Sequence, residues 1–254
     1  MKRFISFSGG VESTTMCLLF GKGATAIFSD TGFEHEEMYK RLENVEQTLK
    51  EHHNGDFEIV RVRNEKYTLP EYIQKGNYYM SSAKVKGGRF CTGMFKIQVI
   101  DKFLSQYNER VELMIGLNAD EDREGNYEQM KNVDYTYPLQ DIGMTRFDCI
   151  ELLEKYELEP RLPPYMRRGG CIGCPFKTKK EYKAMVHLAL HEIMQVAEIE
   201  KGIQDKRDKY FKVKPELGRL SEFIQIEQNN LFGDLSEYYD FDEDFKPCGL
   251  FCHR

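Results

Sequence analysis

The chain has 254 residues, of which 41% are hydrophobic and 13% aromatic, enough for one large domain, alone or with an appendage. Its formal net charge of −6 argues against general, sequence-independent binding of nucleic acid, although it leaves a local basic cleft open. No apolar run approaches the roughly 18 residues of a membrane span, and no signal peptide is evident. We therefore expect a cytoplasmic protein, in which seven cysteines indicate metal or redox chemistry.

Strand and helix patterns alternate through the first half of the chain. Short apolar runs predict strands at residues 4–7, 24–28, 57–62 and 111–117. Helical spacing of apolar residues predicts helices at residues 12–20, 36–52 and 92–107. Strands separated by helices pair in parallel through right-handed crossovers, so the fold class is α/β with a Rossmann-like parallel sheet.

The pattern changes after Pro138. Helices are expected at residues 145–157 and from 178 to about 203, and Pro160, Pro163 and Pro164 break the chain between them. We expect a nucleotide-binding α/β domain over residues 1–140. A C-terminal helical lobe over residues 141–254 would cover its sheet and carry a cysteine-ligated metal centre.

The first strand leads into the sequence Ser-Gly-Gly-Val-Glu-Ser at residues 8–13. Gly9 and Gly10 can adopt backbone angles that turn successive N–H groups toward one point. The helix that follows adds unpaired N–H groups and the positive end of its dipole. The pattern predicts a phosphate or sulfate site, and Val11 supplies no charge, so a cation must come from elsewhere.

Two further turns follow predicted strands and should face the same crevice, since ligands bind beyond the carboxyl ends of parallel strands. Asp30 and Thr31 precede Gly32, and Asp30 could hold a metal or a ribose hydroxyl; helix capping by Asp30 and Thr31 is the alternative. The later loop carries Asp120 and Arg123. Arg123 is the expected cation for a nucleotide phosphate, and an ordinary charged loop is the alternative.

The cysteines fall into two groups. Cys171 and Cys174 have the C-x-x-C spacing that lets two thiolates reach one metal from a turn. Cys91 is the expected third ligand, and the tail offers Cys248 and Cys252. All-thiolate sites suit Zn²⁺ or an iron–sulfur cluster. The two remaining cysteines, at positions 17 and 149, lie within predicted helices and are expected to pack in the core.

The Ser-Gly-Gly-x-x-Ser segment resembles the PP-loop of ATP pyrophosphatases and of the phosphoadenosine-phosphosulfate (PAPS) reductase family. Four later segments resemble that family in the same order. They are Asp-Thr-Gly-Phe-Glu at residues 30–34, Arg-Phe-Cys-Thr with Lys96 at residues 89–96, Gly-Leu-Asn-Ala-Asp-Glu-Asp-Arg at residues 116–123, and Arg-Gly-Gly-Cys-Ile-Gly-Cys-Pro-Phe at residues 168–176. The chain is thus similar to phage and bacterial PAPS-reductase-like proteins, whose fold is of the adenine nucleotide alpha hydrolase type.

The resemblance implies roles for particular residues. The nucleotide-binding set is Ser8, Gly9, Gly10, Glu12, Ser13, Asp30, Thr31, Gly32, Asp120 and Arg123. The catalytic set is Asp30, Lys96 and Cys252, and the metal ligands are Cys91, Cys171 and Cys174 with one cysteine of the tail. Between the two tail cysteines, Cys248 is preferred over Cys252 as the fourth ligand because Pro247 and Gly249 place it in a tight turn. The resemblance favours a [4Fe-4S] cluster with Zn²⁺ as the alternative, together with ATP or PAPS and Mg²⁺ as a further ion.

The preferred function is ATP-dependent adenylation coupled to sulfur or nitrogen transfer. Thiol-dependent reduction of PAPS or adenosine phosphosulfate is the first alternative, but the tail lacks the Glu that precedes Cys-Gly in the reductases, and Cys91 has no adjacent second cysteine. A non-catalytic nucleotide-binding phage or defence accessory protein is the second. Expected partners are an adenine nucleotide and a sulfur donor or thioredoxin-like protein. A nucleic-acid substrate and a homo-oligomer remain open.

Overall fold

A five-stranded parallel sheet forms the centre of the computed structural model, which describes residues 1–81, 89–121, 130–167 and 170–229. The strands are β1 (Lys2–Phe7), β2 (Ala24–Ser29), β3 (Glu58–Val62), β4 (Val111–Ile115) and β5 (Val133–Thr136). Their spatial order is β3-β2-β1-β4-β5, and every neighbouring pair is parallel. The expected α/β fold with a Rossmann-like parallel sheet is confirmed. Its strand order reverses between β1 and β4, where such sheets bind ligands.

The sheet is buried on both faces because alternate side chains of each strand point to opposite sides. Ile5 of β1 is level with Ala26 of β2 and Met114 of β4. These three belong to one hydrophobic core. Phe4 and Ile27, one position along in their strands, belong to a second core on the other face.

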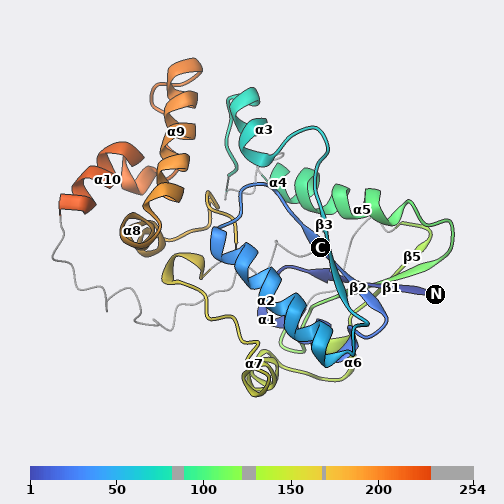
Figure 1. Cartoon of the computed structure of the whole chain (residues 1–254). Helices are drawn as coiled ribbons and strands as arrows, with labels where there is room; N and C mark the ends of the chain where they lie inside the picture. The colour runs from blue at the N-terminus through green and yellow to red at the C-terminus, as the bar shows by residue number, and fades with distance from the viewer. Residues whose placement is uncertain (82–88, 122–129, 168–169, 230–254) are drawn as a thin grey trace.

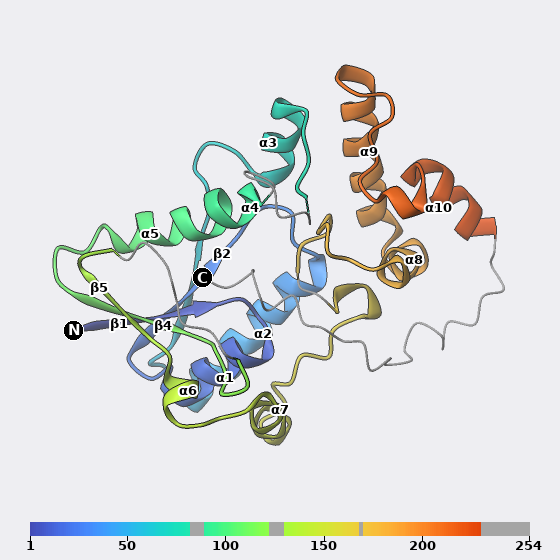
Figure 2. The same cartoon turned by 180° about the vertical axis from the view of Figure 1, so that it is seen from behind.

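Helices cover the two faces (Figures 1 and 2). On one face lie α1 (Val11–Phe20) and α2 (Glu36–His52), and α7 (Arg146–Lys155) packs against α1. The opposite face carries α5 (Gln98–Leu104). In α2 the buried positions Met38, Leu42, Val45 and Leu49 form the predicted apolar stripe. Within the described residues, no helix is long and apolar enough to cross a membrane.

Three further helices lie beyond the carboxyl ends of the strands and pack against one another (Figure 1). They are α8 (Lys179–Leu188), α9 (Leu190–Lys206) and α10 (Leu220–Asn229). Their buried residues join the same core as α1 and α2. At the start of α8, Thr178 and Glu181 form a capping box, in which each side chain accepts a hydrogen bond from the other residue's N–H. A second box, Thr145 with Asp148, begins α7.

Two long predicted helices differ from their predictions in detail: the first ends earlier than expected and contains a π-helical stretch, and the second is divided in two. Residues 90–104 form α4 (Phe90–Thr92), a π-helical stretch η1 (Gly93–Ile97) and then α5. The helix expected from residue 178 breaks at Ala189, whose φ of −146° and ψ of 50° lie outside the helical range. Not expected from the sequence are β5, α10, α3 (Leu69–Gly76), α6 (Pro138–Asp141) and the short turns η2 (Pro164–Met166) and η3 (Pro215–Leu217).

Candidate functional site

The turn between β1 and α1, here called the glycine loop (residues 8–14), lies at the point where the strand order reverses. Gly9 has a φ of +76°, and a Cβ there would come 2.7 Å from the sulfur of Met38. Both observations require glycine at this position. Gly10 is different, because its φ of −79° and ψ of 178° are open to any residue and a Cβ would meet only Ser8 Oγ, at 3.5 Å.

Hydroxyl groups hold the shape of the glycine loop. Ser13 Oγ accepts a hydrogen bond from the Ser8 N–H at 3.2 Å and lies 3.1 Å from Ser8 Oγ. Thr14 Oγ1 donates to the Gly10 carbonyl at 2.7 Å. In the described part of the chain, no side chain caps the amino end of α1 at Gly10. The loop therefore presents backbone N–H groups from which an anion can accept hydrogen bonds.

A cation that the sequence reasoning missed contacts the glycine loop from α2. Arg41 Nε donates to the Gly9 carbonyl at 2.6 Å, and Nη2 donates to Thr14 Oγ1 at 3.0 Å and to the Leu158 carbonyl at 3.1 Å. Burial lowers the pKa of this guanidinium to about 10, so it stays charged at neutral pH. The only sequence signal is that Arg41 follows Met38 by three residues, which places it beside the buried stripe of α2.

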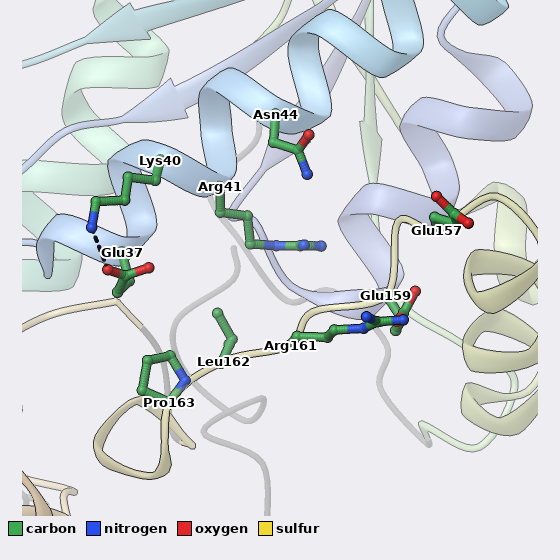
Figure 3. Close-up of a pocket in the computed structure, with 9 residues that line it drawn as sticks. All are labelled: Glu37, Lys40, Arg41, Asn44, Glu157, Glu159, Arg161, Leu162 and Pro163. Atoms are coloured by element: carbon green, nitrogen blue, oxygen red, sulfur yellow. Dashed lines mark hydrogen bonds and ion pairs between the residues drawn. The ribbon is translucent and has the colours of Figure 1, made fainter. Parts of the chain in front are cut away.

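Arg41 also lines a pocket of about 440 Å³ between α2 and residues 157–163. Figure 3 shows its side chain extending from α2 toward the segment that carries Glu159 and Arg161. Lys40 and Glu37 form an ion pair at the edge of this pocket, and Arg161 pairs with Glu159. Positive and negative side chains are therefore balanced around the pocket, which lies beside α2 next to the glycine loop.

The end of β4 packs directly onto the start of α1. A Cβ at Gly116 would come within 3.1 Å of the Ser13 nitrogen, so a side chain there would push against the backbone of α1. Asn118 donates to Glu12 Oε1 at 3.1 Å, and Arg146 of α7 forms an ion pair with the same carboxylate. The Glu12 carboxylate is therefore engaged by side chains from two other segments.

The predicted residue Asp120 lies in the same loop. Its Oδ2 accepts from the Arg146 N–H at 2.9 Å, in the first turn of α7, and its own N–H donates to Asn118 Oδ1 at 2.9 Å. Arg123, the expected phosphate cation, lies outside the described residues. Asn118 and Arg146 were not singled out from the sequence.

The Asp30-Thr31-Gly32 turn follows β2 at the same edge of the sheet. Asp30 is buried, and its Oδ1 accepts from the Gly32 N–H at 2.8 Å and from the Tyr39 hydroxyl at 2.9 Å. Arg63 pairs with Oδ2 at 3.1 Å. Gly32 has a φ of +68°, and a Cβ would clash with Thr68 at 2.7 Å. The Asp30 carboxylate therefore organises this turn.

The predicted C-x-x-C segment, here called the cysteine loop (residues 170–177), pairs with the end of that turn. Cys171 forms an antiparallel bridge with Glu34. The His35 N–H donates to the Gly170 carbonyl at 2.6 Å, and the Ile172 N–H donates to the Phe33 carbonyl at 2.8 Å. The segment that follows the Asp30-Thr31-Gly32 turn and the cysteine loop are therefore joined by backbone hydrogen bonds.

The three described candidate ligands affect one another electrostatically near this junction. Burial raises the pKa of the Cys171 thiol, and the charges of Glu34, Cys174 and Cys91 raise it further. Cys91 of α4 thus lies within electrostatic range of Cys171, as does Cys174 of the same cysteine loop. Among the described residues, no group of three or more His, Cys, Asp or Glu is placed to hold a metal ion. Cys248 and Cys252 lie outside the described residues.

Charged side chains surround the thiols. The pKa of buried Glu34 is raised by desolvation, an effect that the positive charges of Lys96 and Lys177 oppose. Lys96, predicted as catalytic, comes from the π-helical stretch and lies near both Glu34 and Cys171. Lys177 is fully buried and donates to the Tyr165 carbonyl. This junction therefore holds a carboxylate and two ammonium groups beside the cysteines.

A buried pair of titratable residues, His35 and Glu192, lies where α2 meets α9. His35 Nδ1 contacts the Glu192 carboxylate, whose other oxygen accepts from the Glu36 N–H at 2.9 Å and so caps α2. Burial lowers the pKa of His35 to about 4, despite the opposing effect of Glu192. Cys17 and Cys149 are buried core residues, as predicted.

Comparison with known proteins agrees with this geometry. A family described as "Phosphoadenosine phosphosulfate reductase domain" matches residues 2–142, more than half of the chain. An uncharacterized protein of Methanocaldococcus jannaschii is 30% identical over 120 residues. That match covers 44% of this chain but only 22% of the relative's length. The chain belongs to the phosphoadenosine phosphosulfate reductase domain family, whose members are PP-loop nucleotide-binding enzymes.

Proposed function

We propose that this protein binds ATP at the glycine loop and adenylates an oxygen atom of an acceptor, which then receives sulfur or nitrogen. The observation that carries the proposal is the uncapped amino end of α1 at the point where the strand order reverses. N–H groups fixed in advance stabilise negative charge that develops on a departing group. In this reaction the departing group is pyrophosphate.

Each predicted residue has a place in this scheme. The N–H groups of Gly9 and Gly10 and the hydroxyls of Ser8 and Ser13 would bind the phosphates. Glu12 would act through the bonds that fix α1 to Asn118 and Arg146. The remaining nucleotide-binding assignments are Asp30, Thr31 and Gly32 toward the ribose or Mg²⁺, Asp120 as the support of its loop, and Arg123 as the phosphate cation.

A thiolate-bound metal is the second part of the proposal. Cys91, Cys171 and Cys174 would hold it together with Cys248, and Cys252 would be free for redox chemistry. The mutual electrostatic effects of the three described thiols support this set. A [4Fe-4S] cluster fits the all-sulfur donors and would bind or deliver sulfur, with Zn²⁺ as the alternative. Lys96 is proposed as the catalytic cation beside Glu34 and Cys171.

The second candidate is reduction of PAPS or adenosine phosphosulfate by a tail thiol. The description of the family favours it. In that reaction the glycine loop would bind the nucleotide phosphates in the same way. The tail thiolate would attack the sulfur atom, break its bond to the phosphate oxygen and release the nucleotide, leaving an S-sulfonated cysteine. A thiol of a thioredoxin-like protein would displace sulfite from this cysteine, and the same protein would then regenerate the tail thiol. A nucleotide-binding protein without turnover is the third candidate.

Product analysis separates these candidates. The protein is purified anaerobically, and its iron, zinc and sulfide are measured together with the absorption spectrum. It is then incubated with ATP and a sulfide source, and separately with PAPS and reduced thioredoxin. Pyrophosphate release from ATP supports adenylation, whereas sulfite release from PAPS would replace it with reduction. Nucleotide binding without either product, tested across candidate acceptors, would favour the third candidate.

A further inference from the structure

We propose that Arg41 is a positioning residue that orients the peptide between Gly9 and Gly10 for anion binding. This inference rests on the proposed role of the glycine loop. Arg41 Nε donates to the Gly9 carbonyl at 2.6 Å. In a trans peptide the carbonyl and the following N–H point in opposite directions. Fixing the Gly9 oxygen on the side of α2 therefore turns the Gly10 N–H to the other side, where it donates to Ser8 Oγ at 3.4 Å.

The remaining bonds of the guanidinium make this orientation rigid. Nη2 donates both to Thr14 Oγ1 at 3.0 Å and to the Leu158 carbonyl at 3.1 Å. Thr14 Oγ1 in turn donates to the Gly10 carbonyl at 2.7 Å. The planar guanidinium thus contacts one end of the Gly9–Gly10 segment directly and the other through Thr14. The single ammonium of lysine cannot reproduce this fork.

Arg41 also brings a positive charge to a loop that has none of its own, because Val11 is apolar. The guanidinium contacts the Gly9 carbonyl and also lines the pocket beside α2 that Figure 3 shows. Its charge adds to that of the helix dipole at the amino end of α1. Orientation and charge together predict that Arg41 affects anion affinity without touching the anion.

A purely structural role makes a different prediction. If Arg41 only ties α2 to α1 and to the Leu158 segment, its replacement lowers the melting temperature and leaves the affinity of the folded protein unchanged. Two variants separate charge from geometry: Arg41→Lys keeps the charge and loses the fork, and Arg41→Gln loses both. Lys40→Gln is the matched control, because Lys40 precedes Arg41 on the same helix and is 66% exposed in its side chain.

Inorganic pyrophosphate and ATP are titrated into each purified protein by calorimetry, below its melting temperature. We expect Kd to rise about tenfold in Arg41→Lys and further in Arg41→Gln, since the hydrogen bonds that the guanidinium donates to the loop are charge-assisted and are lost in both variants. Lys40→Gln should bind as the wild type does. Wild-type Kd in both Arg41 variants, with only a lower melting temperature, would overturn the inference.

Amide resonances of the ligand-free proteins decide the inference even if the wild type binds neither probe. The ¹⁵N–¹H signals of Gly9 and Gly10 should move in Arg41→Lys and stay in place in Lys40→Gln. Unchanged Gly9 and Gly10 signals in Arg41→Lys would show that the guanidinium does not orient this peptide. Failure of the wild type to bind would instead contradict the proposed function.

Discussion

The glycine loop and the cysteine loop lie at the same edge of the sheet but are built in different ways. In the glycine loop, hydroxyls of Ser8, Ser13 and Thr14 and the guanidinium of Arg41 fix the backbone. In the cysteine loop the backbone is fixed by pairing with residues 33–35, whereas the thiol of Cys171 lies among groups that disfavour its charge. We therefore expect the first loop to accept an anion without rearrangement, and the second to need a cation before its thiols ionise.

This difference teaches how each site responds to its ligand. A preformed set of N–H groups binds phosphate without releasing protons. A buried thiol with a raised pKa must lose its proton when a metal binds, so metal binding is coupled to pH and to folding. The backbone bonds between His35 and Gly170 and between Ile172 and Phe33 join the cysteine loop to the segment that follows the Asp30-Thr31-Gly32 turn. Two changes test this comparison: removal of a proposed metal ligand from the cysteine loop, and removal of the buried pair formed by His35 and Glu192.

The largest effect is expected from Cys171→Ser. This variant should lose the bound metal and several kcal/mol of unfolding free energy, since a structural metal contributes directly to folding. Iron, zinc and sulfide analysis of anaerobically purified protein measures the loss. Cys149→Ala is the control, because Cys149 is a buried core cysteine whose thiol lies beside Thr15 of α1.

The expected pattern is full metal in Cys149→Ala and none in Cys171→Ser. Serine variants of Cys91 and Cys174 should behave like Cys171→Ser. Cys248→Ser should also lose metal, while Cys252→Ser keeps it. Full metal content in Cys171→Ser, or no metal in the wild type, would remove the metal centre from this account.

A smaller effect is expected from acid. His35 has a pKa lowered to about 4 from 6.5, because it is buried. Below pH 6.5, His35 therefore binds a proton in the unfolded chain, whereas in the folded protein it stays neutral until about pH 4. Stability is fully present above pH 6.5 and falls as pH decreases toward 4, by up to about 3 kcal/mol. Burial alone would raise the pKa of Glu192, but its hydrogen bonds and the neighbouring histidines lower it, so the stability that this carboxylate contributes is also lost as the pH falls.

Denaturant titrations at pH 7, 6 and 5 measure this dependence. His35→Gln should flatten it, because the group that resists protonation is gone. His191→Gln is the matched control, since the ring of His191 is 57% exposed and also contacts a glutamate, Glu36, at 3.0 Å. Equal pH slopes in the wild type and His35→Gln would show that this imidazole is not kept neutral by the fold.

Much of the fold followed from periodicity. The apolar runs of β1, β2 and β4 and the stripe of α2 are local signals, and their parallel pairing follows from the helices between them. The short edge strand β5 has only the four residues Val-Asp-Tyr-Thr and gives almost no pattern. No proline marks the π-helical stretch at Gly93–Ile97 or the break at Ala189, so neither was predicted from the sequence.

Some residues of the candidate site could likewise be predicted from local sequence patterns, and others could not. Gly9 and Gly32 could be found from the sequence because a left-handed turn needs glycine. Gly10 was expected to share that need, but its backbone is extended. Arg41 could not be found, because its role depends on where α2 passes the Gly9 carbonyl, and tertiary approach leaves no local pattern.

The most direct test of the nucleotide site uses Gly10. Its backbone angles and surroundings admit a side chain, so Gly10→Val should fold with an unchanged melting temperature. The branched side chain would stand beside the N–H groups that receive the phosphates. Calorimetric titration of ATP and of PAPS into both proteins is predicted to show binding to the wild type and at least about a hundredfold weaker binding to Gly10→Val. Equal affinity in the two proteins would place the nucleotide elsewhere and contradict the account.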